Sequence, residues 1–150
     1  MDTALIIATS VVASIVFVVL LLVAITLVLK VVTSKLRVRG EAALAKLGDV
    51  VLSNTLAQSF GQQSLGVTQA RGTGALALTK NELYFLLYVP ERDLRIPLSA
   101  NEEISFVRSH LGKTQGVDLL HVRFAGDAIA WRLPDAGDWK TKIESARAAR

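Results

Sequence analysis

The chain has 150 residues, a formal net charge of +4 and a hydrophobic content of 51%. This length allows one ordinary domain with an appendage and excludes two full domains. The absence of cysteine excludes disulfides, thiolate nucleophiles, cysteine-based zinc sites and a lipidated cysteine. The hydrophobic residues are not spread evenly, because the amino-terminal stretch consists almost entirely of them.

Residues 1–33 are predicted to form a transmembrane anchor with its flank. From Thr3 to Leu29 the sequence has no charged residue, no proline and no glycine. A helix of this length, at ~1.5 Å per residue, exceeds the ~30 Å hydrocarbon core of a bilayer. A cleaved signal peptide has basic residues before a shorter apolar run, whereas Asp2 precedes this one. The sequence therefore favours an anchor that is retained.

Residues 34–47 are predicted to be a juxtamembrane basic segment with a short helix from about Glu41, ending at Gly48. Four cations follow the apolar stretch: Lys30, Lys35, Arg37 and Arg39. Because Lys and Arg collect on the cytoplasmic side, we expect a single-pass protein of the cell membrane with its amino terminus outside. The same four residues are the expected lipid contacts, since they would lie beside anionic headgroups.

Residues 48–150 are predicted to form a cytoplasmic domain, mainly β, built as a small antiparallel barrel closed by a carboxy-terminal helix. A period of two runs through the segment from Arg71, and a polar loop is expected at 61–70. Trp139, Ile143 and Ala146 form one helical stripe, which must dock on the strands. Strands are expected at 49–60, 74–79, 82–89, 93–98, 103–108, 118–124 and 128–133.

Four motifs carry a resemblance to a known superfold: the glycine-leucine pattern from Gly74, Ile96-Pro97-Leu98, Gly112-Lys113 and Asp138-Trp139. Over roughly residues 48–148 the chain resembles pleckstrin-homology-like domains, especially GRAM-like ones, here in a bacterial-style single-pass membrane protein. The resemblance implies a capped barrel that binds either phosphoinositides or proteins. Phosphoinositide binding in this superfold uses a basic loop between the first two strands, and the loop at 61–70 contains no basic residue. A protein partner is therefore favoured over a lipid.

No motif in the sequence predicts catalysis or a cofactor. The glycines at 71–74 and Gly112 lack the spacing of a phosphate-binding loop, and each borders a strand. His110 and His121 have no carboxylate or cysteine at ligand spacing, so no metal site is expected. Cations are interleaved with acids and no stacking platform is visible, which argues against nucleic acid. We expect no enzyme activity, no cofactor and no identifiable small-molecule ligand.

The predicted function is a non-catalytic, membrane-tethered binding or scaffolding module that recruits a membrane-associated protein. Tethering raises the effective concentration of such a partner. The candidate interaction surface is the second face of strand 82–89, formed by Tyr84, Leu86 and Tyr88. The pattern is equally compatible with a covered face, in which the 41–47 helix or a second sheet layer packs on these three residues. The sequence also allows a structural subunit of a larger membrane complex and, with weaker support, an enzyme.

Overall fold

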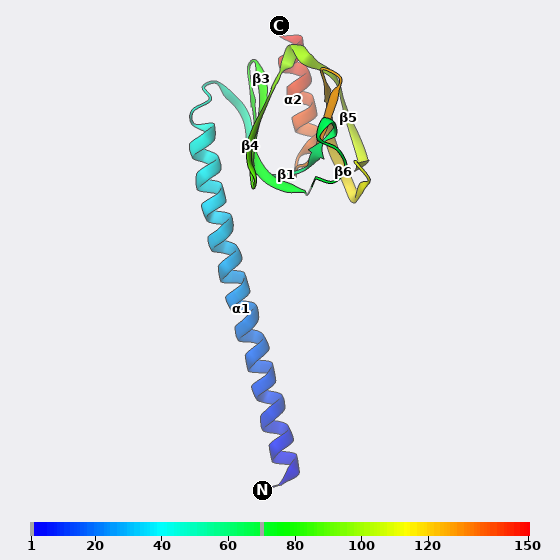
Figure 1. Cartoon of the computed structure of the whole chain (residues 1–150). Helices are drawn as coiled ribbons and strands as arrows, with labels where there is room; N and C mark the ends of the chain where they lie inside the picture. The colour runs from blue at the N-terminus through cyan, green and yellow to red at the C-terminus, as the bar shows by residue number, and fades with distance from the viewer. Residues whose placement is uncertain (1, 70) are drawn as a thin grey trace. The chain divides into compact units, whose positions relative to one another are not determined.

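The computed structural model describes residues 2–69 and 71–150, so Met1 and Ala70, the last residue of the predicted 61–70 loop, lie outside the described residues. The chain divides into two compact units, one ending at Lys35 and the other spanning Leu36–Arg150. The second unit holds a curled antiparallel sheet and a carboxy-terminal helix (Figure 1). The predicted fold class is confirmed, being mainly β with an apolar amino-terminal helix and a closing helix.

Helix α1 spans Thr3–Leu44, and its part up to Lys35 makes up the first unit. By length and composition this helix is a candidate membrane span. Its hydroxyl groups bond back to the helix itself: the Thr9 hydroxyl donates to the Leu5 carbonyl at 2.9 Å, and that of Ser14 to Ser10 at 2.8 Å. Polar side chains satisfied in this way suit an apolar solvent.

The sheet has seven strands, all antiparallel, in the order β4-β3-β2-β1-β7-β6-β5. Pro97 ends β4 at the edge of the sheet, as its missing N–H predicts. The strands are β1 (Val50–Gln62), β2 (Gly72–Thr79), β3 (Glu82–Tyr88), β4 (Glu91–Pro97), β5 (Asn101–His110), β6 (Lys113–Phe124) and β7 (Asp127–Arg132), with single 3₁₀ turns η1 (Gln63–Leu65) and η2 (Leu98–Ala100).

One hairpin is tighter than the sequence predicts. The sequence leaves residues 109–117 outside the expected strands, but β5 continues to His110 and β6 begins at Lys113. Leu111 and Gly112 alone form the connection, with φ angles of 50° and 72°. Two consecutive positive φ values produce the two-residue turn that matches strand twist. Gly112 therefore allows a tight two-residue turn in place of a longer loop.

The main core fills the inner side of the curled sheet. The inward residues predicted from the alternation, among them Leu76, Phe85 and Trp131, are buried there, and the rings of Phe85 and Trp131 meet edge to face. Helix α2 (Ala136–Ala148) adds Trp139 and Ile143 to this core, as its stripe predicts. Asp135 occupies the N-cap of α2 and makes no side-chain capping bond.

Candidate functional site

The aromatic face of β3 is buried. The exposed fractions of Tyr84, Leu86 and Tyr88 are 7%, 7% and 3%, and the three pack with Leu44 at the end of α1. The prediction that they form an open interaction surface is therefore wrong. The competing expectation, that the helical segment before Gly48 covers them, describes the structure. That segment is the last part of α1 and not a separate helix starting at Glu41.

The end of α1 contacts the sheet through Gly40 and Arg39. Gly40 is buried beside the Tyr88 hydroxyl, which donates to the Thr55 carbonyl of β1 at 2.7 Å. Arg39 forms an ion pair with Glu91 and lies 5.7 Å from the centre of the Tyr88 ring. Burial raises the pKa of the Tyr84 and Tyr88 hydroxyls, so both remain protonated and able to donate. The compact unit consequently begins at Leu36, ahead of the expected domain boundary at residue 48.

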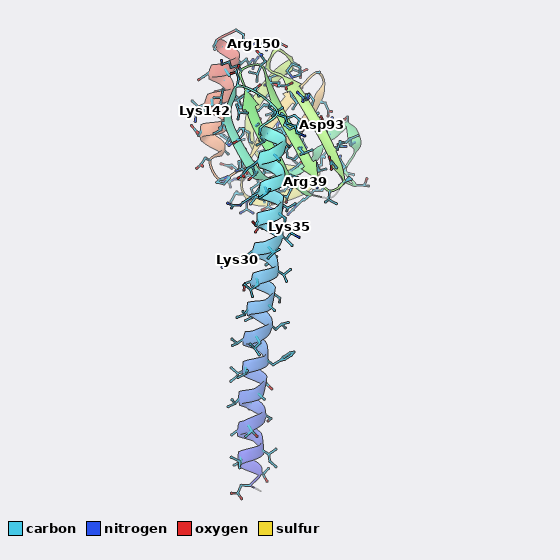
Figure 2. The ribbon with its side chains drawn as sticks, turned by 90° about the vertical axis from the view of Figure 1, so that its left-hand side faces the viewer. Lys30, Lys35, Arg39, Asp93, Lys142 and Arg150 are labelled. Carbon is cyan, nitrogen blue, oxygen red and sulfur yellow. The ribbon has the colours of Figure 1, made fainter. Side chains whose placement is uncertain are left out.

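The four predicted lipid contacts do not share one environment. Lys30 and Lys35 are exposed in the first unit, and Arg37 is exposed in the second. Arg39 lies against β3 and the start of β4, where Glu91 neutralises it (Figure 2). The guanidinium of Arg39 is therefore paired within the protein, and its contact with lipid headgroups stays a prediction.

Strand β1 has a neighbour on both sides for only part of its length. It pairs with β2 from Val50 to Ser59, but with β7 only from Gln58 onward. Strand β7 ends at Arg132 and Pro134 follows, so in the described part of the chain no strand lies beside the first half of β1 opposite β2. Exposure follows this difference, because Val51 is 49% exposed whereas Phe60 is fully buried.

A bulge separates the two halves of β1. The register with β2 shifts between Asn54 and Ala57. Within the bulge, the Leu56 N–H donates to Asn54 Oδ1 at 2.8 Å, and the Thr55 carbonyl accepts the Tyr88 hydroxyl. Because these side chains satisfy the bulge backbone, the bend is a defined feature of the strand.

Two open hollows flank the bulge. One has a volume of about 760 Å³ and lies between the end of α1 and the Ser53–Leu56 stretch. The other, of about 830 Å³, lies at the start of α2, where Phe106 and Val117 are each 43% exposed. Leu56 and Pro134 line both hollows, which are therefore neighbours, and together they are called the β1 trough. A free strand edge beside apolar side chains is suited to an extended peptide.

The sequence signal for the trough is a difference in strand length. Strand β1 is about twice as long as β7, which ends just before Pro134. A proline at this point stops the ladder, so one half of the longer strand has to lack a partner. Sequence reasoning missed this because it did not determine which strands are neighbours.

The two histidines come together on the outer side of the sheet. Their ring centres are 5.3 Å apart, and His110 Nε2 lies 3.0 Å from the Gly61 carbonyl oxygen. Burial lowers the pKa of both imidazoles, and the neighbouring His110 lowers the pKa of His121 further. Within residues 2–69 and 71–150 no three His, Asp or Glu side chains gather at a metal-binding distance. Within the pair, His110 is buried and His121 is half-buried.

Asp127 anchors the segment that follows β1. Its carboxylate accepts hydrogen bonds from the Ser64 N–H at 2.9 Å, the Ser64 hydroxyl at 2.7 Å and the Gln62 amide at 2.6 Å. Burial raises the pKa of this carboxyl, but the hydrogen bonds outweigh burial and leave the pKa lower than usual. The loop segment 63–69, which follows β1 and has no charged residue of its own, is therefore held by Asp127 at the start of β7.

The lowered pKa of Asp127 predicts an acid-dependent stability. A carboxyl with a depressed folded-state pKa stabilises the protein above its unfolded pKa of about 4, and this contribution disappears as the pH falls through the folded pKa. Asp127→Asn should cost about 1–2 kcal/mol at pH 7 and much less below about pH 3, measured by urea unfolding. Asp135→Asn is the control, because Asp135 makes no capping bond. Equal losses at both pH values would contradict the prediction.

Comparisons with known proteins find likenesses among solved structures. No family description and no curated protein matches the chain. The chain is similar to the crystal structure of the C-terminal domain of an unknown protein from Leishmania infantum, with a TM-score of 0.51 and 13% sequence identity. The match covers 73% of this chain and 93% of that one. At this identity the likeness shows that the fold recurs, and nothing about activity.

Proposed function

We propose that the chain is a membrane-tethered, non-catalytic binding or scaffolding module of the pleckstrin-homology-like, GRAM-like kind, which recruits a protein partner at the cytoplasmic membrane face. The observation that carries the proposal is the β1 trough, where a free half-strand lies beside exposed apolar side chains. The curled seven-stranded sheet closed by one helix supports the assignment to that superfold. The apolar helix α1 supplies the tether.

A protein partner suits the chemistry of the compact unit better than a lipid headgroup does. Among the described residues between β1 and β2, 63–69 contain no cation, and the guanidinium of Arg71 lies over the Phe60 ring, 4.8 Å from its centre. Arg39 is engaged by Glu91, and the last helix uses Lys140 and Lys142 in ion pairs with Glu144 and Asp138. A polyphosphorylated headgroup needs several converging cations. The trough instead presents backbone and apolar surface, which are the usual components of a peptide site.

The proposed topology places the amino terminus outside and residues 36–150 in the cytoplasm. Lys30 and Lys35 follow the apolar stretch, whereas Asp2 is the charged side chain before it. A reporter enzyme that works only in the cytoplasm should be active when fused after Arg150. A reporter that works only outside the cytoplasm should be inactive at the same position, and the reverse result would overturn the topology.

The binding function is tested by crosslinking the full chain in its native membrane. A photoreactive amino acid replaces Ser53, which lines the trough, and in a second variant Ser109, an exposed serine on β5. We expect a discrete protein adduct from position 53 and none from position 109. Adducts of equal yield at both positions, or lipid adducts alone at position 53, would refute a protein site in the trough.

A further inference from the structure

We infer that the partner binds by adding an extended strand of its own to β1, alongside Val50–Asn54, with an acidic residue near Arg132. This inference rests on the proposed function and specifies how its site recognises a partner. In this mode, main-chain hydrogen bonds supply affinity and the side chains of alternate residues supply specificity.

The first observation is that the two outer edges of the sheet are blocked and the half-edge of β1 is not. Natural proteins protect exposed edges with charges or proline, because unpaired N–H and C=O groups invite another strand. The outer strand β4 carries Glu91, Arg92, Asp93, Arg95 and Pro97, and β5 carries Glu102, Glu103 and Arg108. The half-edge has the sequence VVLSNTLA over residues 50–57, with neither a charge nor a proline.

The second observation is which backbone groups remain available. At the bulge, Leu56 N–H and the Thr55 carbonyl already have partners within the chain. Val50 and the stretch Leu52–Asn54 are paired with β2 on one side alone, with a register shift between Val50 and Leu52. In the regular stretch Leu52–Asn54, alternate residues direct their N–H and C=O away from β2. An added strand can therefore pair with this stretch, after which its side chains continue past the bulge into the apolar hollow at Phe106 and Val117.

The third observation is the charge along the trough. Asp49 is paired with Lys80, and Asp118 with Arg108. Arg37 and Glu41, one turn apart on α1, line the trough with opposite charges and, among the described residues, form no ion pair. Arg132 is exposed and likewise forms none, so it places an unpaired positive charge at the α2 end of the trough. An incoming segment that is apolar at alternate positions and acidic at that end complements the site.

The test uses the full chain in nanodiscs and a displayed library of linear peptides of about eight residues, apolar at alternate positions and acidic at one end. The selected peptides are then synthesised in two sets, with N-methyl groups on the odd or on the even residues. A strand uses the N–H groups of one edge for pairing, so one set should lose about tenfold or more in affinity while the other keeps it. Sets that bind equally, or a library that yields no binder, would overturn the inference.

Substitutions in the protein locate the bound peptide. Ser53→Lys introduces an edge lysine and should weaken binding about tenfold, whereas Ser109→Lys on β5 should leave it unchanged. Arg132→Glu should weaken acidic-ended peptides and favour lysine-ended ones. Binding that ignores Ser53→Lys, or crosslinks at position 53 that join two copies of this chain, would refute the inference. If native crosslinks persist at position 53 and these peptides fail, the recognition mode is wrong and the proposed function stands; if both fail, the function falls as well.

Discussion

Replacing Trp139 with alanine should destabilise the Leu36–Arg150 fragment by about 3–5 kcal/mol, the usual cost of removing a buried aromatic side chain. Trp139 is 3% exposed and belongs to the same core cluster as Trp131 and Ile143. The loss combines the apolar surface of the ring with the cavity that it leaves, because a packed core relaxes only partly.

The effect is expected to be large because α2 has few other anchors. Ile143 is the other buried side chain of the helix, and Ala146 is partly buried. Without the indole, the helix retains too little apolar contact to offset the entropy of ordering it. Glu144→Ala is the matched control on the exposed side, where the ion pair with Lys140 contributes at most about 1 kcal/mol. Chemical unfolding that shows a loss below about 1 kcal/mol for Trp139→Ala would mean that α2 does not close the core.

Much of the fold could be predicted from the sequence, because apolar residues at alternate positions indicate which face of a strand is buried. Leu83 and Phe85 in β3, and Ile129 and Trp131 in β7, were expected inward and are buried in the main core. The positions of proline and glycine predicted most strand boundaries, since proline fixes φ and lacks an N–H whereas glycine adopts the positive φ that tight turns require. The helical stripe of α2 could also be predicted, because its apolar residues recur with the period of a helix and not with that of a strand.

The covering of β3 could not be predicted with the same methods. In this strand both faces are apolar, so alternation indicates two buried faces without saying what covers the second one. The cover comes from the end of α1, whose relevant residues, Leu36, Gly40 and Leu44, recur every four positions. Glycine within a basic stretch is usually a sign of flexibility, and here it is instead a contact position.

The β1 trough was missed for a related reason. A hydrophobic pattern reports which side of a strand is buried, but it does not report which strands are neighbours. The bulge at Thr55 and Leu56 depends on bonds from Asn54 and Tyr88, the latter 33 positions away from Thr55. Such a long-range bond leaves no local signature in the sequence, so the half-edge becomes visible in the structure alone.

Gly40→Ala provides the sharpest test of how α1 ends. In an isolated helix this change is favourable by about 1 kcal/mol, because alanine loses less backbone entropy than glycine. In the structure, a Cβ atom at position 40 would lie 2.2 Å from the Tyr88 hydroxyl oxygen and 3.1 Å from the Thr55 side chain. The hydroxyl cannot move away without giving up its bond to the Thr55 carbonyl. We therefore expect a net loss of about 1–3 kcal/mol in the Leu36–Arg150 fragment.

The test is whether Gly40→Ala lowers or raises the free energy of unfolding. Gly137→Ala is the matched control. Gly137 is also helical, but a Cβ atom there would meet nothing within 4 Å. That variant should gain about 0.5–1 kcal/mol, because the substitution restricts the unfolded chain at a compatible position. Unfolding in urea, followed by tyrosine absorbance, measures both variants and also reports whether Tyr84 and Tyr88 become exposed. If Gly40→Ala is as stabilising as Gly137→Ala, the end of α1 does not cover β3, and the aromatic face would again be open to solvent.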